Sequence, residues 1–288
     1  MNAGKRFRKL LEEEKCLVLP GAYDCLSARI IEKIGFKAMD VTGLGIEASR
    51  LGQPDLGLAT MSEVVDQAWS IANSVDIPVI FDADTGYGGP MNVARTVRAF
   101  WQVGIAGIHI EDQAMPKKCG NLSGKQLIPC EEMVKKIKVA KDVLADKDFV
   151  IIGRCDAREK GPDEVKRRLY AYLQAGADLI MLGDDYPVDE LREMGREFRG
   201  KLYLVAGVYA GEEMCLSVSE YAEMGFKAVS FPIVGFLAAA KAIQDVYELL
   251  HSDAHISPQR HAGHCMPLRK VNEILDMGKW VELDQYSG

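Results

Sequence analysis

Short apolar runs alternate with longer amphipathic stretches along most of the sequence, and this alternation limits the possible folds more than any other feature. The short runs are rich in β-branched residues and have the length of buried strands, whereas the longer stretches repeat apolar residues at helical spacing. The pattern predicts helices that include 62–74, 92–103, 131–144, 164–174, 189–198 and 212–224. It predicts strands at 17–19, 38–41, 79–81, 107–110, 149–153, 179–182, 202–205 and 228–231.

Glycine stands between a helical stretch and the next predicted strand at Gly35, Gly104, Gly176 and Gly225. A left-handed glycine at this place ends a helix and lets the chain fold back. Repeated strand–helix units predict parallel strands with right-handed crossovers, and eight units close a barrel. An open doubly wound sheet is the alternative, but no Gly-x-Gly-x-x-Gly follows the first strand. We therefore predict the α/β class, as a (β/α)8 TIM-type barrel.

Length and composition limit the organisation and the partners. A chain of 288 residues with 48% hydrophobic content can bury one substantial core, so we predict a single domain over 1–288, with the barrel at about 15–250 and a helical tail at about 251–288. The net charge of −7 predicts no nucleic-acid or membrane partner. Seven cysteines without a Cys-x-x-Cys pair, and an acidic N-terminal region in place of a secretory signal, predict a cytoplasmic protein.

Two aspartates follow the third predicted strand. Asp82 and Asp84 come at the end of the apolar run 77–81 and, two residues apart on a strand, point the same way. Paired carboxylate oxygens suit Mg²⁺, which takes one or two carboxylates with waters and substrate oxygens. Glu111 and Asp112 end the next predicted strand and strengthen the metal interpretation. The alternative is that one aspartate caps the next helix and the other is solvated.

Other predicted strands also end in polar or glycine residues, and in a parallel barrel these ends share one rim. The stretch Thr42-Gly43-Leu44 offers backbone N–H groups to a substrate carboxylate. Arg154 follows a later strand and has the planar donor geometry for bidentate carboxylate recognition. The alternative for Arg154 is an ion pair with Asp156 or Glu111.

The segment 112–125 is too long and too polar for a simple strand–helix connection, and we predict a lid with glycine hinges. Lys117 and Lys118 stand beside Cys119, and two neighbouring ammonium groups would lower the pKa of the thiol. Cys119 is therefore a candidate proton donor or acceptor. An ordinary exposed cysteine in a basic loop is the alternative.

Six short motifs occur in order along the chain: Gly-Ala-Tyr-Asp at 21–24, Thr-Gly-Leu at 42–44, Leu-Gly-Gln-Pro-Asp at 51–55, Asp-Ala-Asp-Thr-Gly-Tyr-Gly at 82–88, Ile-Glu-Asp-Gln at 110–113 and Pro-Lys-Lys-Cys-Gly at 116–120. Together, over about 15–250, they resemble the isocitrate lyase/phosphoenolpyruvate mutase superfamily. Within this superfamily, the Lys-Lys-Cys-Gly motif resembles that of the carbon–carbon lyase branch, to which 2-methylisocitrate lyase and 2,3-dimethylmalate lyase belong.

The resemblance implies an assembly and a metal. It implies a homotetramer in which a C-terminal helix, here 236–250, swaps between subunits. It also implies Mg²⁺, or Mn²⁺ in its place, with Asp82 and Asp84 near the ion and Asp55 and Glu111 acting through water.

The resemblance further implies a substrate site. Thr42, Gly43, Leu44 and Arg154 would bind the 2-oxo acid end of the substrate, and Cys119 would protonate the leaving fragment. The remaining substrate-site positions are Gly120, Asn121 and Asp184. Asp40 is a candidate base, since it stands where similar lyases place a tyrosine before the substrate loop.

Several positions depart from the family pattern. Asn121 stands in place of a histidine, Leu237 in place of an arginine, and Ala206, Val208 and Ala210 in place of an asparagine with neighbouring hydroxyl residues. These changes remove polar partners for a second or third substrate carboxylate, and an unpaired buried carboxylate costs several kcal/mol. A tricarboxylate substrate is therefore disfavoured.

We accordingly predict a Mg-dependent lyase that cleaves a 2-hydroxy acid of the alkylmalate or methylisocitrate type to pyruvate or glyoxylate plus a short acid. The alternatives are an oxaloacetate decarboxylase or hydrolase, a phosphonate mutase or hydrolase, and a non-catalytic binding protein. A Schiff-base aldolase is disfavoured, because Lys37 and Lys227 stand at strand entries. His109 lies inside a predicted strand and is interpreted as a core or supporting group, and 268–280 is predicted to be one helix.

Overall fold

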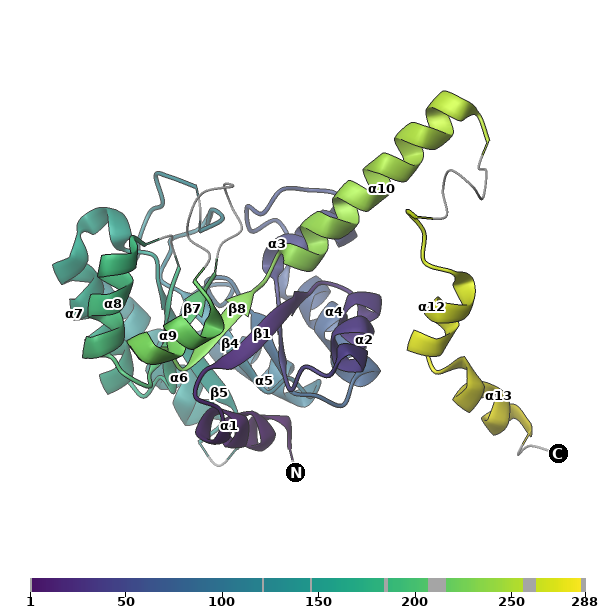
Figure 1. Cartoon of the computed structure of the whole chain (residues 1–288). Coiled ribbons are helices and arrows are strands. Elements are labelled where there is room, and N and C mark those ends of the chain that lie inside the picture. Colours follow the sequence, from purple (N-terminus) through teal and green to yellow (C-terminus); the bar gives the residue numbers. More distant parts are fainter. Residues whose placement is uncertain are drawn as a thin grey trace.

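The computed structural model describes residues 2–120, 122–145, 147–183, 186–206, 216–255 and 263–285. Each strand pairs in parallel with the next along the chain, and the last pairs with the first, so the sheet is a closed barrel (Figure 1). The predicted barrel is thus confirmed. The strands are β1 (Leu17–Ala22), β2 (Met39–Val41), β3 (Val79–Asp82), β4 (Gly107–Glu111), β5 (Val150–Cys155), β6 (Leu179–Leu182), β7 (Leu202–Val205) and β8 (Ala228–Phe231).

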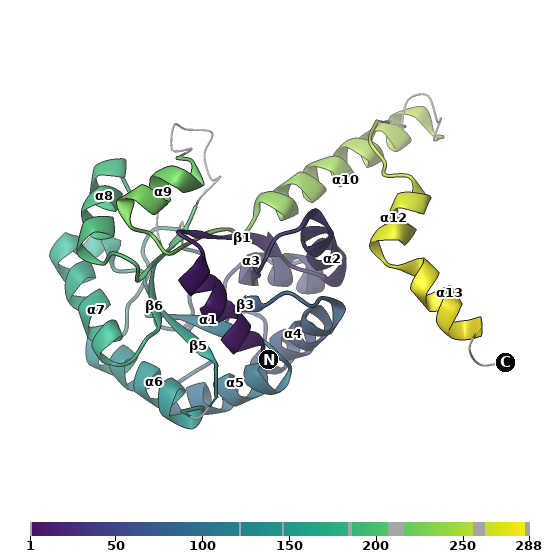
Figure 2. The ribbon, with the colours of Figure 1, turned by 60° about the horizontal axis from the view of Figure 1, so that its bottom comes forward.

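Helices between the strands form a ring around the barrel (Figure 2). The glycines predicted to end helices have the expected left-handed backbone, with φ between 93° at Gly104 and 113° at Gly225. The helices are α2 (Cys25–Ile34), α4 (Met61–Ser74), α5 (Pro90–Gln102), α6 (Cys130–Val143), α7 (Pro162–Gln174), α8 (Val188–Glu197) and α9 (Val218–Met224).

The predicted helix at 212–224 begins later than expected among the described residues. The side chain of Ser217 accepts a hydrogen bond from the Glu220 N–H, and the Glu220 carboxylate accepts one from the Ser217 N–H. This reciprocal capping box fixes the first turn of α9 at Val218. Residues 212–215 lie outside the described part of the chain.

The buried apolar side chains form two clusters. The larger one includes residues of the strands and of the surrounding helices, and the smaller one fills the barrel interior and includes Ile80 of β3 and Ile152 of β5. The helix α1 (Ala3–Glu13), which the sequence interpretation missed, lies across one end of the barrel and adds the fully buried Phe7 to this cluster (Figure 2). Successive side chains of a strand alternate between its faces. Asp82 and Arg154, two residues after the interior isoleucines, therefore face the same interior at its other end.

The chain after β8 leaves the barrel. The helix α10 (Val234–Asp253) points away from it and contains no buried residue (Figure 1). The single helix predicted at 268–280 is wrong: the chain forms α12 (Leu268–Ile274) and α13 (Met277–Gln285). They are separated because Asp276 takes a left-handed φ of 54°, and its carboxylate pairs with Arg29 and Lys33 of α2. No helix of the described residues is long and apolar enough to cross a membrane.

Candidate active site

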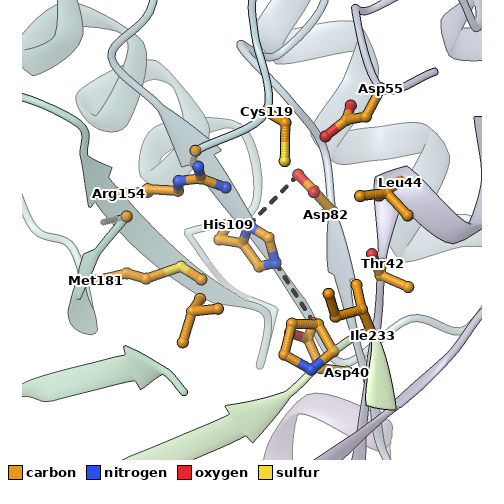
Figure 3. Close-up of a pocket in the computed structure, with 14 residues that line it drawn as sticks. Asp40, Thr42, Leu44, Asp55, Asp82, His109, Cys119, Arg154, Met181 and Ile233 are labelled. Carbon is orange, nitrogen blue, oxygen red and sulfur yellow. Dashed lines mark ion pairs between the residues drawn. The ribbon is translucent and has the colours of Figure 1, made fainter. Parts of the chain in front are cut away.

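A pocket opens at the end of the barrel opposite α1, where the strands finish (Figure 3). Strand register explains how its polar wall forms from distant parts of the sequence. Asp82 is paired with His109 across β3 and β4, and Glu111 with Arg154 across β4 and β5. The polar residues that line the pocket are Asp40, Thr42, Asp55, Asp82, His109 and Arg154.

The Asp82 carboxylate is held by backbone N–H groups. One oxygen accepts from the Asp84 N–H at 3.0 Å and the other from the Gly43 N–H at 3.4 Å. Burial alone would raise the pKa of Asp82, but the charges of His109, Lys117 and Arg154 and the Asp84 N–H outweigh it, so the pKa is lowered. Asp82 therefore stays ionised at neutral pH.

Lys117 connects two further carboxylates. This buried lysine comes from the loop after β4, forms an ion pair with Asp55, and lies 2.6 Å from Asp84 Oδ1. Burial raises the pKa of Asp84 to about 7; Lys117 opposes this rise, while the charges of Asp82 and Asp55 add to it. Carboxylates thus exceed cations at this point of the site.

The loop that carries Asp55 is anchored from below. Glu47, in the short π-helical turn η1 (Glu47–Leu51), accepts hydrogen bonds from the N–H groups of Leu56 and Ala59 at 2.9 Å each. Both partners follow Asp55 closely in the sequence. The position of Asp55 is therefore set by a buried backbone-to-carboxylate clamp.

Arg154 lies in a narrow slot. Its guanidinium is 3.3 Å from Glu111 Oε2 and donates to Asp156 Oδ1 at 3.1 and 3.2 Å. A Cβ at Gly120 would come within 2.5 Å of Arg154 Nη2, and one at Gly183 within 2.6 Å of its Nε. Burial opposes its charge, but Asp156 and Glu111 raise the pKa of Arg154 well above its usual value. Arg154 is therefore ion-paired with Glu111 and Asp156, and it also lines the pocket.

The predicted lid is tied to the barrel by Gln113. Its carboxamide donates to the Lys118 carbonyl and to Asp156 Oδ2 at 2.9 Å each, and accepts from the Lys118 N–H at 2.9 Å. The Lys118 ammonium donates to the carbonyls of Ser123 and Gly124 at 3.3 and 3.2 Å. Cys119 lines the pocket beside these contacts. Both lysines of the motif therefore have partners of their own.

His109 lies between two carboxylates. Its Nδ1 is 3.5 Å from Asp82 Oδ1 and its Nε2 is 3.4 Å from Asp40 Oδ1 (Figure 3). Burial lowers the pKa of His109, but the two aspartates outweigh it and the pKa is raised. The sequence interpretation treated His109 as a core or supporting group. In the structure His109 connects Asp40 with Asp82 and also lines the pocket.

Apolar side chains also line the pocket, and together they form its apolar wall. They come from the ends of β6, β7 and β8 and from the segment after β2, and they are Leu44, Met181, Val205, Pro232 and Ile233. Leu237 is 42% exposed, lies on α10, and is not among the described residues that line the pocket. The apolar wall therefore forms without it.

The structure brings most of the predicted site residues together. Thr42, Leu44 and Gly120 line the pocket, and Gly43 contributes its N–H to Asp82. Asn121, Asp184, Val208 and Ala210 lie outside the described residues.

Sequence reasoning missed three features of the site. They are the pairing of Lys117 with Asp55 and Asp84, the hydrogen bond from Tyr203 to Asp40, and the apolar wall. A usable signal existed for Tyr203, since it is the one polar side chain in the apolar run 202–205. For Lys117 no signal existed, because its partners are 33 or more residues away in the sequence.

The carboxylates of the pocket have the ligand chemistry that a divalent ion requires. Within the described ranges, no three His, Cys, Asp or Glu side chains are grouped to hold an ion by themselves. Mg²⁺ requires only one or two carboxylates and completes its shell with water and substrate oxygens. Glu111 Oε1 is buried without a hydrogen-bond partner in the part of the chain described, and the charges of Glu111, Asp55, Asp82 and Asp84 all act on Lys117. This acidic set fits a hydrated divalent ion.

Comparison with known proteins identifies the family. Residues 7–251 match the family model described as phosphoenolpyruvate phosphomutase. The chain is 42% identical over 255 residues to 2,3-dimethylmalate lyase of Eubacterium barkeri, covering 88% of each protein. It is 36% identical over 266 residues to 2-methylisocitrate lyase of Bacillus subtilis (strain 168), covering 92% of this chain and 86% of that protein.

Solved structures agree. An oxaloacetate acetylhydrolase in complex with 3,3-difluorooxalacetate has a TM-score of 0.92 at 35% identity and covers 100% of this chain and 97% of its own. A phosphonopyruvate hydrolase in complex with oxalate and Mg²⁺ has a TM-score of 0.88 at 27% identity, with 99% of each chain covered. The predicted enzyme family is confirmed: the chain belongs to the phosphoenolpyruvate mutase/isocitrate lyase superfamily of enzymes.

Proposed function

We propose that the protein is a Mg²⁺-dependent carbon–carbon lyase that cleaves an alkylated 2-hydroxy acid of the malate type to pyruvate or glyoxylate and a short carboxylic acid. The observation that carries this proposal is the mixed lining of one pocket. Acidic and cationic groups and aliphatic side chains line it together. A substrate with a polar 2-hydroxy acid end and an alkyl-bearing end matches both.

The metal belongs with the acidic groups. Asp82 and Asp84 would hold Mg²⁺, with Asp55 and Glu111 bound through water, and Mn²⁺ is an acceptable replacement because it takes the same oxygen ligands. When bound, the ion stabilises negative charge that develops on the 2-oxygen. Lys117 already supplies one positive charge to Asp55 and Asp84, and this charge offsets part of the acidic set.

Protein groups bind and orient the substrate. The Arg154 guanidinium, held in its slot by Glu111 and Asp156, would bind the substrate carboxylate together with the Thr42-Gly43-Leu44 loop. Gly120, and the neighbouring Asn121 and Asp184, would complete this side of the site.

Two side chains would handle protons. Asp40 would accept the proton of the substrate hydroxyl as the C2–C3 bond breaks, and Cys119 would donate its thiol proton to the carbanion left on C3. Both residues line the pocket, Asp40 from β2 and Cys119 from the loop after β4. Closure of that loop would exclude water, which would otherwise quench the carbanion.

The apolar wall decides between substrates. Met181, Val205 and Ile233 offer no partner to a second or third carboxylate, and leaving one unpaired costs several kcal/mol. Alkyl groups on C3 instead gain contact with this wall. The names of the two lyase relatives, which act on dimethylmalate and methylisocitrate, support the same reaction type.

The second candidate is decarboxylation or hydrolysis of oxaloacetate. The similarity to the oxaloacetate acetylhydrolase structure favours it, as does the fact that oxaloacetate makes little use of the apolar wall. It would produce CO₂ or oxalate. Phosphonate mutase or hydrolase activity ranks below it, because it leaves Cys119 without a role.

The experiment is a substrate panel. The purified protein with Mg²⁺ is incubated with 2,3-dimethylmalate, citramalate, 2-methylisocitrate, isocitrate and oxaloacetate, and release of 2-oxo acid, oxalate and CO₂ is measured. We expect the highest kcat/KM for an alkylated malate, and loss of turnover with EDTA. Isocitrate as the best substrate would contradict the assignment of the apolar wall.

The proton donor is tested by Cys119→Ser. A serine hydroxyl is a far weaker acid than a thiol, so we expect kcat to fall by about 100-fold or more. Cys265→Ser is the matched control, since Cys265 is exposed in the C-terminal segment, far from the pocket in sequence and structure. An undiminished kcat in the Cys119 variant would show that another group donates the proton.

We also propose a homotetramer with exchanged α10 helices, in the cytoplasm. An apolar groove runs between α2 and the start of α10, lined by side chains that include Leu26, Ile30 and Ile34. In a (β/α)8 barrel this is where a helix following β8 would cover the sheet, but α10 points away (Figure 1). The occupant that fits is α10 of a second copy, whose exposed Ile243 and Tyr247 are one helical turn apart.

A further inference from the structure

A buried tyrosine–aspartate pair lies in the wall of the pocket. The Tyr203 hydroxyl donates a hydrogen bond to Asp40 Oδ2 at 2.7 Å, and both residues are almost fully buried. Tyr203 belongs to β7 and Asp40 to β2, two strands that are not neighbours in the barrel. Since β8 and β1 lie between these two strands, the contact crosses part of the barrel interior.

The second oxygen of Asp40 faces His109. Asp40 Oδ1 and His109 Nε2 form an ion pair at 3.4 Å, and neither atom makes a hydrogen bond of normal geometry among the described residues. Asp40 also lines the pocket. A carboxylate oxygen can accept more than one contact, so Oδ1 can still accept a hydrogen bond from a ligand group in the pocket.

The charged groups around Asp40 come from several strands. His109 of β4 and Tyr203 of β7 face it directly, and beyond His109 lie Asp82 of β3 and Arg154 of β5. Burial, and next the charge of Asp40, raise the pKa of Tyr203 well above its usual value. The tyrosine therefore keeps its proton at neutral pH, and its hydroxyl is the donor to Asp40.

We infer that Tyr203 is a positioning residue that holds the Asp40 carboxylate and aims its Oδ1 oxygen at the 2-hydroxyl group of the substrate. This inference rests on the proposed lyase function and adds to it the group that controls the base. In the step concerned, the O–H bond of the substrate breaks and the proton moves to Asp40 Oδ1. The oxygen electron pair forms C2=O, the C2–C3 pair stays on the C3 fragment, and the Cys119 proton neutralises that fragment. No oxidant or reductant is needed.

The kinetic test uses Tyr203→Phe, which keeps the ring and removes the hydroxyl. With Mg²⁺ and the best acid of the panel, we expect kcat to fall about 10- to 100-fold and KM to stay within about twofold. A merely structural role would lower the unfolding midpoint and raise KM without this selective fall in kcat, and that result would overturn the inference.

Tyr172→Phe is the matched control. The Tyr172 hydroxyl also donates to a buried aspartate, Asp112, at 2.5 Å, but neither residue is among those described as lining the pocket. Its loss should leave both kcat and KM within about twofold of the wild-type values. Asp40→Asn should lower kcat at least as far as Tyr203→Phe, and full activity of the Asp40→Asn variant would overturn the inference.

A measurement that needs no turnover separates this inference from the proposed function. Urea unfolding midpoints are compared for Tyr203→Phe, Asp40→Ala and the double variant. If Tyr203 acts through Asp40, the double variant should unfold at a midpoint no lower than that of the weaker single variant. Strictly additive losses would show that the two side chains act separately. If the wild-type protein cleaves no acid of the panel, the proposed function fails, and this cycle alone decides whether Tyr203 holds Asp40.

Discussion

At the scale of single residues, the site depends on side chains that fit without spare room. Arg154 lies between the backbone at Gly120 and Gly183, and a Cβ at Gly183 would lie 1.9 Å from Asp156 Oδ1 and 2.6 Å from Arg154 Nε. The absence of a side chain at Gly183 is therefore what allows Arg154 and Asp156 to pair. An arginine that is displaced by one ångström loses alignment with a bound carboxylate.

Gly183→Ala should consequently lower kcat/KM for the best acid by about 100-fold, the size expected for a misplacement of roughly 1 Å. Circular dichroism should show the folded protein, and the kinetic loss is measured from initial rates. Gly278→Ala is the control, because a Cβ there meets no atom within 4 Å. Equal kcat/KM for the Gly183 variant and wild type would mean that Arg154 does not need its slot.

At the scale of elements, α1 closes the barrel at the end away from the pocket. Arg8 of α1 donates to Asp178 Oδ1 at 2.7 Å and to the Phe149 carbonyl at 2.9 Å. The same aspartate accepts from the Ile151 N–H at 2.8 Å and pairs with Lys141 of α6 at 3.0 Å. One carboxylate thus joins α1, β5 and α6 before β6 begins.

Asp178→Asn should destabilise the protein by about 2 kcal/mol at pH 7, the usual size for losing charge-assisted hydrogen bonds. Burial opposes ionisation, but the Arg8 hydrogen bond, the Ile151 N–H and the charges of Arg8 and Lys141 lower the pKa of Asp178 in the folded state. Its stabilisation is therefore complete above the unfolded pKa of about 3.9 and is lost as the pH falls through the lower folded pKa.

Urea unfolding from pH 7 down to pH 3 measures this dependence. The gap between wild type and Asp178→Asn should be constant above about pH 5 and should narrow below about pH 4. Asp189→Asn is the control, since its ion pair with Arg192 is exposed and should give no measurable gap at any pH. A gap that does not change with pH would contradict the role assigned to the Asp178 charge.

At the scale of the whole molecule, the strands close a complete barrel, but an apolar groove on its surface is left uncovered. The groove between α2 and α10 is apolar, and α10 exposes 57% of Ile243 and 63% of Tyr247. Apolar surfaces of this extent mark association sites. The double variant Ile243→Asp/Tyr247→Asp should therefore convert a larger assembly into monomers, as measured by light scattering after size-exclusion chromatography.

Gln244→Glu serves as the control for added charge on the same helix and should keep the assembly. A wild-type protein that is already a monomer would contradict the exchanged arrangement. If the assembly survives the double variant, the association surface lies elsewhere than on this face of α10.

The sequence by itself determined the barrel and the acidic rim, because both depend on local patterns. Strand and helix periods are visible residue by residue, the glycines of left-handed turns follow the helices, and Asp82 and Asp84 share a face through strand geometry alone. The break between α12 and α13 was not visible, since it depends on the contact of Asp276 with Arg29 and Lys33 of a distant helix.

Only the tertiary structure decided which groups pair inside the site. Because the barrel closes between β8 and β1, β7 comes near β2 and Tyr203 reaches Asp40 across 163 positions of sequence; the fold also places Lys117 against Asp55 from 62 positions away. No local pattern encodes such pairs, because they depend on the register and closure of the whole sheet. Short sequence motifs therefore determine which residues stand at the rim of the barrel, whereas the tertiary fold determines which partners set the charges of these residues.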